Sequence, residues 1–146
     1  MVCAISLNEI FKRKKHEIDR YETTYNFRLI WPLFVTIMDS LYDAADGKFI
    51  PGEIKLESFK RLGAQYNADG LCYIGDMEVL VLETSGWGYD HIKGTFALLA
   101  MFRSFIQKYY YALPREFAEL KLWFAHAREQ QISFMMATIF VYDGLW

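Results

Sequence analysis

Apolar side chains recur at steps of three and four residues over the first third of the chain, which is the spacing of an amphipathic helix. Ser6 followed by Glu9 has the spacing of a capping box at a helix start. Pro32 lies inside an apolar stretch, residues 29–41. Because proline removes a backbone donor and clashes with the preceding turn, a break or kink is expected just before it. The pattern predicts two helices, or one bent helix, over residues 6–44.

The next segment is polar and shows almost no period. It opens at Asp46-Gly47 and runs to Asn67. Ile54, Leu56 and Phe59 are its main apolar positions, and they predict only a short strand or a turn of helix.

Two short apolar runs then indicate a β-hairpin. They cover residues 71–74 and 77–82 and are separated by Gly75-Asp76, a typical turn dipeptide. The part from Val79 to Leu82 is apolar at every position, so it would be buried on both faces. We expect it to be a central strand of the sheet.

The second half of the chain predicts a helix followed by two strands. The helix runs from Asp90 to about Tyr110, and its glycine and alanine positions allow close approach to a sheet. After an interruption at Leu113-Pro114 and a short helical stretch, residues 120–127 and 132–141 have the character of strands. The order predicts an α/β fold with a central mixed sheet of four or five strands flanked by helices.

Composition limits the class of protein. A chain of 146 residues fits a single domain, and 53% apolar with 23% charged residues excludes a disordered chain. Aromatic residues reach 18%, which predicts a bulky interior.

Charge, cysteines and apolar runs bear on compartment and partners. Sixteen basic and eighteen acidic residues give a net charge of −2. This charge is not typical of a nucleic-acid-binding protein, although it is compatible with a local basic groove. Two cysteines make neither a disulfide framework nor a zinc site. The longest apolar run, residues 96–102, is far shorter than the roughly 20 residues of a membrane-spanning helix. We expect an intracellular protein of the cytoplasm or nucleus without a membrane partner.

Two acids flank the predicted hairpin. Asp69 opens its first strand, and Glu83 ends the strand that is otherwise buried carbon, where a carboxylate needs a partner. A three-residue turn of Gly75, Asp76 and Met77 would put Asp69 directly across from Glu83, roughly 5 Å apart at Cβ, whereas a two-residue turn would put them on opposite faces. In the first case the two carboxylates share a site for a hard cation, Mg²⁺ or alternatively Mn²⁺.

A cation on the following helix extends this hypothesis. Lys93 lies in the first predicted turn, close to the end of the strand, and His91 is two residues before it. If Asp69, Glu83 and Lys93 converge, they suit metal-assisted phosphodiester hydrolysis. The carboxylates would hold the metal, which activates water, and the lysine would orient the water or offset charge.

These residues resemble those of a known group. The run Ala68-Asp69-Gly70, the hairpin, residues 78–86 and the run His91-Ile92-Lys93-Gly94 together resemble fungal proteins of the PD-(D/E)XK nuclease-like superfamily. The resemblance covers roughly residues 20–146. It implies a restriction-endonuclease-like core of a helix, three strands, a helix and one or two strands.

The resemblance also implies roles for single residues. The superfamily has an Asp at the start of its second core strand and a Glu-x-Lys in its third, and Asp69 and Glu83 match these acids. Ser85 stands at the lysine position, and because some members carry the lysine on the next helix, Lys93 would be its substitute. The backbone carbonyl of Thr84 would be a further metal ligand. Glu22 is the nearest candidate for the acid that the family often has on its first helix.

Other interpretations remain open. Asp69 before Gly70 suits a turn, and Glu83 suits a simple ion pair with Lys93. The rival function is a catalytically inactive nuclease fold that serves as an interaction or assembly module, in a homo-oligomer or within a longer chain. A third is a small-molecule domain whose pocket is lined by tryptophans, Trp31, Trp87 and Trp123.

Overall fold

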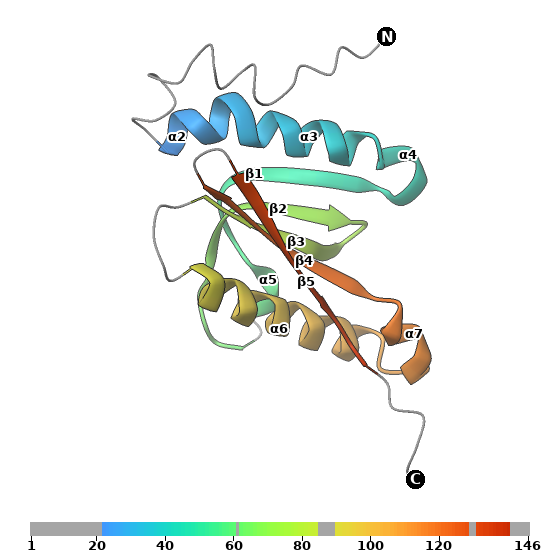
Figure 1. The fold of residues 1–146 in the computed structure, drawn as a ribbon. Coiled ribbons are helices and arrows are strands. Elements are labelled where there is room, and N and C mark those ends of the chain that lie inside the picture. Colours follow the sequence, from blue (N-terminus) through green and yellow to red (C-terminus); the bar gives the residue numbers. More distant parts are fainter. Residues whose placement is uncertain (1–21, 61, 85–89, 129–130, 141–146) are drawn as a thin grey trace.

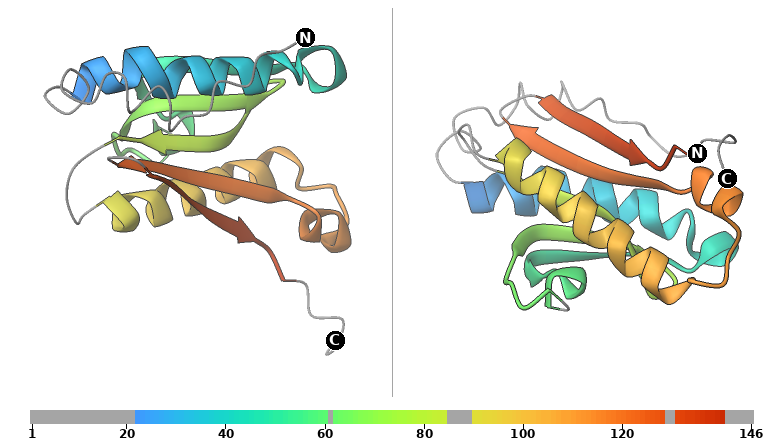
Figure 2. Two further views of the ribbon diagram at one scale, coloured as in Figure 1. Left: turned by 45° about the horizontal axis from the view of Figure 1, so that its top comes forward. Right: turned by 90° about the horizontal axis from the view of Figure 1, so that it is seen from below.

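The fold is an α/β arrangement with one five-stranded mixed sheet between helices. The computed structural model describes residues 22–60, 62–84, 90–128 and 131–140. The strand order is β1-β2-β3-β4-β5, and helices cover both faces of the sheet (Figures 1 and 2). The prediction of a mixed sheet flanked by helices is confirmed. The strands are β1 Gly47–Lys55, β2 Asn67–Ile74, β3 Met77–Glu83, β4 Lys121–Arg128 and β5 Gln131–Thr138.

The N-terminal helices form one continuous run along one face of the sheet (Figure 1). It comprises α2 Glu22–Tyr25, the π-helical segment η1 Asn26–Ile30 and α3 Trp31–Asp39, with the short helix α4 Tyr42–Ala45 after it. Of the two predicted alternatives the break is not found, because the helical run passes through Pro32, and the irregularity lies just before it. The preceding turn widens instead: the Trp31 N–H donates to the Asn26 carbonyl, five residues back. The predicted helical residues 6–21 lie outside the described ranges.

The polar segment after these helices contains a complete strand. β1 has nine residues and pairs with β2 in antiparallel fashion, and α5 Glu57–Lys60 follows it. The sequence-based expectation of only a short strand or helical turn underestimated the length of β1. Pro51 and Gly52 obscure the alternation, and the register shifts between Pro51 and Ile54. Gly52 has a φ of 102°, a conformation that suits glycine.

β2 and β3 form the predicted hairpin, and β3 is the middle strand of the sheet. Val81 of β3 packs in the cluster on the α6 face, and Leu82 packs in the cluster beneath the N-terminal helices. Both are fully buried. The prediction of a central strand covered on both faces is confirmed.

α6 Asp90–Lys108 is the crossover between β3 and β4, which run parallel. A Cβ atom built at Gly94 would lie 2.6 Å from the Phe124 ring, so glycine allows the helix to approach the sheet. α7 Pro114–Ala118 precedes β4, and β5 returns antiparallel to it. No helix in the described ranges is long and apolar enough to cross a membrane.

Candidate functional site

Buried polar side chains gather where β3 ends. Glu83 and Thr84 are 5% and 1% exposed, and Asn26 of η1 and His126 of β4 are also buried. The start of α2, the end of β3 and the start of α6 lie on the same side of the molecule (Figure 1). The group that we call the β3-end cluster consists of Asn26, Tyr66, Asp69, Glu83, Thr84 and His126.

Asp69 and Glu83 lie beside the last residue pair that joins β2 and β3. The turn has two residues, since Ile74 pairs with Met77, so the shorter of the two turns considered from the sequence is the one found. A register shift between Cys72 and Tyr73 then reverses the parity. Gly70 pairs with Leu82, and Asp69 and Glu83 are the next residues beyond this pair on the two strands.

Asp69 is held against the residue that follows Glu83. Its Oδ2 accepts a hydrogen bond of 2.6 Å from the Thr84 backbone N–H and one of 2.7 Å from the Thr84 hydroxyl. Its own backbone carbonyl accepts a bond of 3.1 Å from Trp31 Nε1. Because both carboxylate bonds reach Thr84, the Asp69 side chain is fixed within one peptide unit of Glu83.

Thr84 also connects Asp69 to Asn26. A hydroxyl has one hydrogen, and the Asp69 carboxylate can only accept it. The Asn26 amide must therefore donate to Thr84 Oγ1, at 2.6 Å from Nδ2. This fixes the amide orientation and leaves Asn26 Oδ1 buried, with no hydrogen-bond partner in the described part of the chain. Such an acceptor favours a donor or cation beside it.

Glu83 is held on the side of its strand that faces α6. Tyr66 OH donates to Glu83 Oε1 at 2.5 Å. Glu83 is paired in parallel register with His126, whose ring stacks on Phe124 at 6.3 Å between centroids. A tyrosine hydroxyl therefore meets the buried carboxylate, as the cost of burying a charge requires.

Lys93 lies in the first turn of α6 and is exposed. Thr95, two residues later, contacts Met135 of β5. Since two residues turn a helix by roughly 200°, Lys93 lies on the flank away from β5, which is the flank nearer β3. The Asp69 carboxylate takes its hydrogen bonds from Thr84 rather than from this lysine.

The remaining predicted residues contribute less. Ser85 lies outside the described residues, and for Glu22 and His91 only the backbone is described, in α2 and α6 respectively. Asn26, one turn after Glu22, and Trp31 are residues of the N-terminal helices that bond to the cluster.

The donor set suits a hard divalent cation in kind, because it consists of oxygens: two carboxylates, the Thr84 carbonyl and the orphaned Asn26 Oδ1. Within the described ranges, no three His, Cys, Asp or Glu side chains stand together as a metal centre. Mg²⁺ commonly takes one or two protein carboxylates and keeps several waters, so two acids fit it better than an ion that needs a full protein cage.

Sequence reasoning missed Asn26 and Tyr66. Each is a single polar residue in an aromatic or apolar stretch, and neither belongs to a motif. The sequence indicated them only indirectly: Glu83 ends a buried strand, and a buried carboxylate needs a hydrogen-bonding partner.

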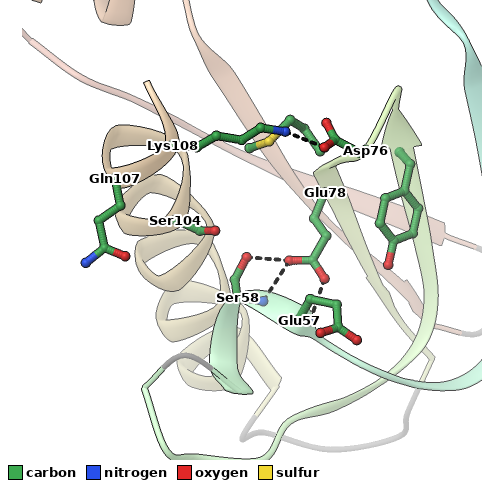
Figure 3. A pocket seen from close by; sticks show the side chains of 9 residues that line it. Glu57, Ser58, Asp76, Glu78, Ser104, Gln107 and Lys108 are labelled. Carbon is green, nitrogen blue, oxygen red and sulfur yellow. Dashed lines mark hydrogen bonds and ion pairs between the residues drawn. The ribbon is translucent and has the colours of Figure 1, made fainter. Parts of the chain in front are cut away.

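A pocket of about 270 Å³ lies at a different place, between α5, the β2–β3 turn and the last turns of α6 (Figure 3). Buried Glu78 accepts bonds from Glu57 N at 2.7 Å, from Ser58 N at 3.1 Å and from the Ser58 hydroxyl. Lys108 pairs with Asp76 at the rim. Burial, with the nearby Glu78 and Glu57, raises the pKa of Tyr73 to about 12. Since all its described bonds go to α5, Glu78 anchors that helix to the hairpin.

Known proteins provide no relative of this chain. No model of a known protein family, no curated protein and no solved structure matches the chain. The molecule is thus characterised by its α/β fold and by a cluster of buried polar side chains at the end of its central strand.

Proposed function

We propose that the chain is a Mg²⁺-dependent nuclease-like domain that hydrolyses nucleic-acid phosphodiester bonds. The observation that supports the proposal is that Asp69 and Glu83 lie beside the last pair of the β2–β3 ladder, and that Asp69 accepts a bond from the amide of Thr84, the residue after Glu83. Further support is the element order of helices, three strands, a helix and two strands, which is the order that the resemblance to the PD-(D/E)XK superfamily implies.

Each residue has a role in this proposal. Thr84 occupies Asp69 Oδ2, so Oδ1 is the oxygen that Asp69 would offer to the cation. Tyr66 orients the Glu83 carboxylate, and the Thr84 carbonyl adds a further ligand. A bound Mg²⁺ supplies an activated water and offsets the charge of the phosphate. Lys93, on the β3 flank of α6, orients that water or balances charge.

A second candidate is an inactive version of the same fold that serves as an assembly module. It is favoured by Ser85 at the lysine position of the motif and by the small number of converging acids in the described part of the chain. It predicts neither metal binding nor cleavage.

The experiment combines metal titration with a nuclease assay. Mg²⁺ and Mn²⁺ are titrated calorimetrically into the purified protein, and cleavage of single- and double-stranded DNA and RNA is followed. The variants Asp69→Asn and Glu83→Gln remove charge at almost constant shape. Asp76→Asn is the matched control, because Asp76 is an exposed acid at the rim of the other pocket.

The proposal expects metal binding and cleavage in the wild type and the control, and a loss of cleavage of at least about 100-fold in both site variants, as for removal of a transition-state contact. Absence of metal binding and cleavage in the wild type selects the assembly module. Cleavage that survives in both site variants would come from another nuclease in the preparation and refutes the assignment.

A further inference from the structure

The two edges of the sheet differ in their protection against a further strand. Proteins block edge pairing with charges, prolines and irregular register. β1 has all three: charges at Lys48, Glu53 and Lys55, a proline at position 51, and a register shift before Ile54.

β5 has none of these devices. Its sequence, QISFMMAT, contains no charged residue, proline or glycine. Its register with β4 is unbroken from Arg128 paired with Gln131 to Lys121 paired with Thr138. Within the described ranges no strand lies beyond β5, which forms the margin of the sheet (Figures 1 and 2). The edge therefore presents regular backbone groups to any added strand.

Ile132, Met135 and Ala137 of β5 pack against the core, but other apolar side chains of the strand are exposed. None of its eight residues is buried. Phe134 is 55% and Met136 45% exposed, and because side chains alternate along a strand they share one face. Trp123 of β4 contacts the Phe134 ring edge-on at 6.5 Å between centroids, so the apolar surface continues inward onto β4.

We propose that β5 pairs with β5 of a second copy of this chain, in antiparallel fashion, and so joins two sheets into one of ten strands. A two-fold axis perpendicular to the sheet puts the same face of both copies on the same side of the joined sheet. Directly opposed residues of the two β5 strands therefore lie on the same face. Phe134 and Met136 of one copy therefore meet the same residues of the other.

Charge favours a second copy as the occupant. A charged edge would repel its own image and select a partner of opposite charge. The neutral β5 edge carries no such penalty, and its apolar face is complementary to itself. This inference is independent of the β3-end cluster, so it stands or falls without the proposed nuclease activity.

The test is sedimentation velocity of the full chain over a concentration series reaching about 100 µM, the dissociation constant of a weak complex. The wild type is expected to shift from monomer to dimer. Phe134→Lys puts a charge on each copy at the interface and should weaken the dimer at least tenfold. Ile50→Lys is the matched control, because Ile50 is an apolar residue, 37% exposed, of β1 at the opposite edge of the sheet.

Hydrogen exchange gives a second measurement on the same variants, with circular dichroism as the check on folding. Amides on the outer edge of β5 should exchange slowly in the dimeric wild type and quickly in Phe134→Lys. A wild type that stays monomeric over the whole series refutes the proposal. So does a dimer that both lysine variants weaken equally, or one that neither weakens.

Discussion

Replacing Thr84 with valine tests the polar connection at the end of β3. The two side chains have nearly the same shape, so the change removes a hydroxyl without opening a cavity. In the folded protein that hydroxyl donates to Asp69 Oδ2 and accepts from Asn26 Nδ2. Valine therefore breaks one charge-assisted bond and leaves the buried Asn26 amide without its acceptor.

The magnitude follows from these two losses. A hydrogen bond to a charged group contributes about 1.5–3 kcal/mol, and a buried donor left unsatisfied costs about 1–3 kcal/mol. Asp69 keeps its bond from the Thr84 N–H, which limits the first loss. We expect the free energy of unfolding to fall by about 3 kcal/mol, equivalent to a Tm lower by roughly 6–12 °C for a chain of this size.

The assay is urea denaturation at neutral pH, followed by circular dichroism. Thr138→Val is the matched control. The Thr138 hydroxyl donates one hydrogen bond of 3.2 Å to the Ala118 carbonyl, and this bond is only partly buried. That single neutral bond is worth about 0.5–1.5 kcal/mol. Adding Asn26→Leu to Thr84→Val removes the stranded amide, so the double variant should lose less than the sum of the single losses. Equal destabilisation by Thr84→Val and Thr138→Val would refute the connection.

Two further changes probe the packing of the sheet. Gly94→Ala places a methyl against the Phe124 ring, which is 1% exposed. Overpacking costs about 1–3 kcal/mol and exceeds the gain in helix propensity of about 1 kcal/mol, so urea denaturation should show a lower free energy of unfolding. A more stable variant would contradict the close approach of α6 to the sheet. Burial raises the pKa of the Cys72 thiol to about 12, so in a Cys3→Ser background the thiol stays neutral at pH 8. It should react with a thiol reagent far more slowly in the folded protein than in urea, where more thiolate forms, and equal rates would mean that Cys72 is accessible.

Local pattern was sufficient for elements whose side chains face one environment. β3 is apolar at successive positions because it is covered on both faces, and α6 carries small residues where it meets the sheet, so both were predicted with nearly correct bounds. β1 was underestimated because Pro51 and Gly52 interrupt its alternation while pairing with β2 still holds it extended. Pro32 correctly marked an irregularity in the preceding turn, but the sequence left open whether the helix breaks there, and widening of that turn keeps the proline within one helical run.

Some residues of the candidate site were predictable from local sequence and others were not. Asp69 and Glu83 were found because a carboxylate at the border of a buried strand is conspicuous in sequence. Their placement at the ends of neighbouring strands depends on a register shift between Cys72 and Tyr73 that no turn dipeptide reports. Asn26 and Tyr66 were not found, because a polar residue acquires its role from partners distant in sequence: Asn26 and Thr84 are 58 positions apart.

The amino-acid order alone was sufficient for elements such as β3 and α6, because hydrophobic spacing and turn residues act over a few neighbours. Only the tertiary structure decided which polar residues bond at the end of β3, which amide oxygen lacks a partner in the described part of the chain, and which strands form the sheet edges there. Those outcomes depend on strand register and on burial by remote elements, and both are set by the packing of the whole chain.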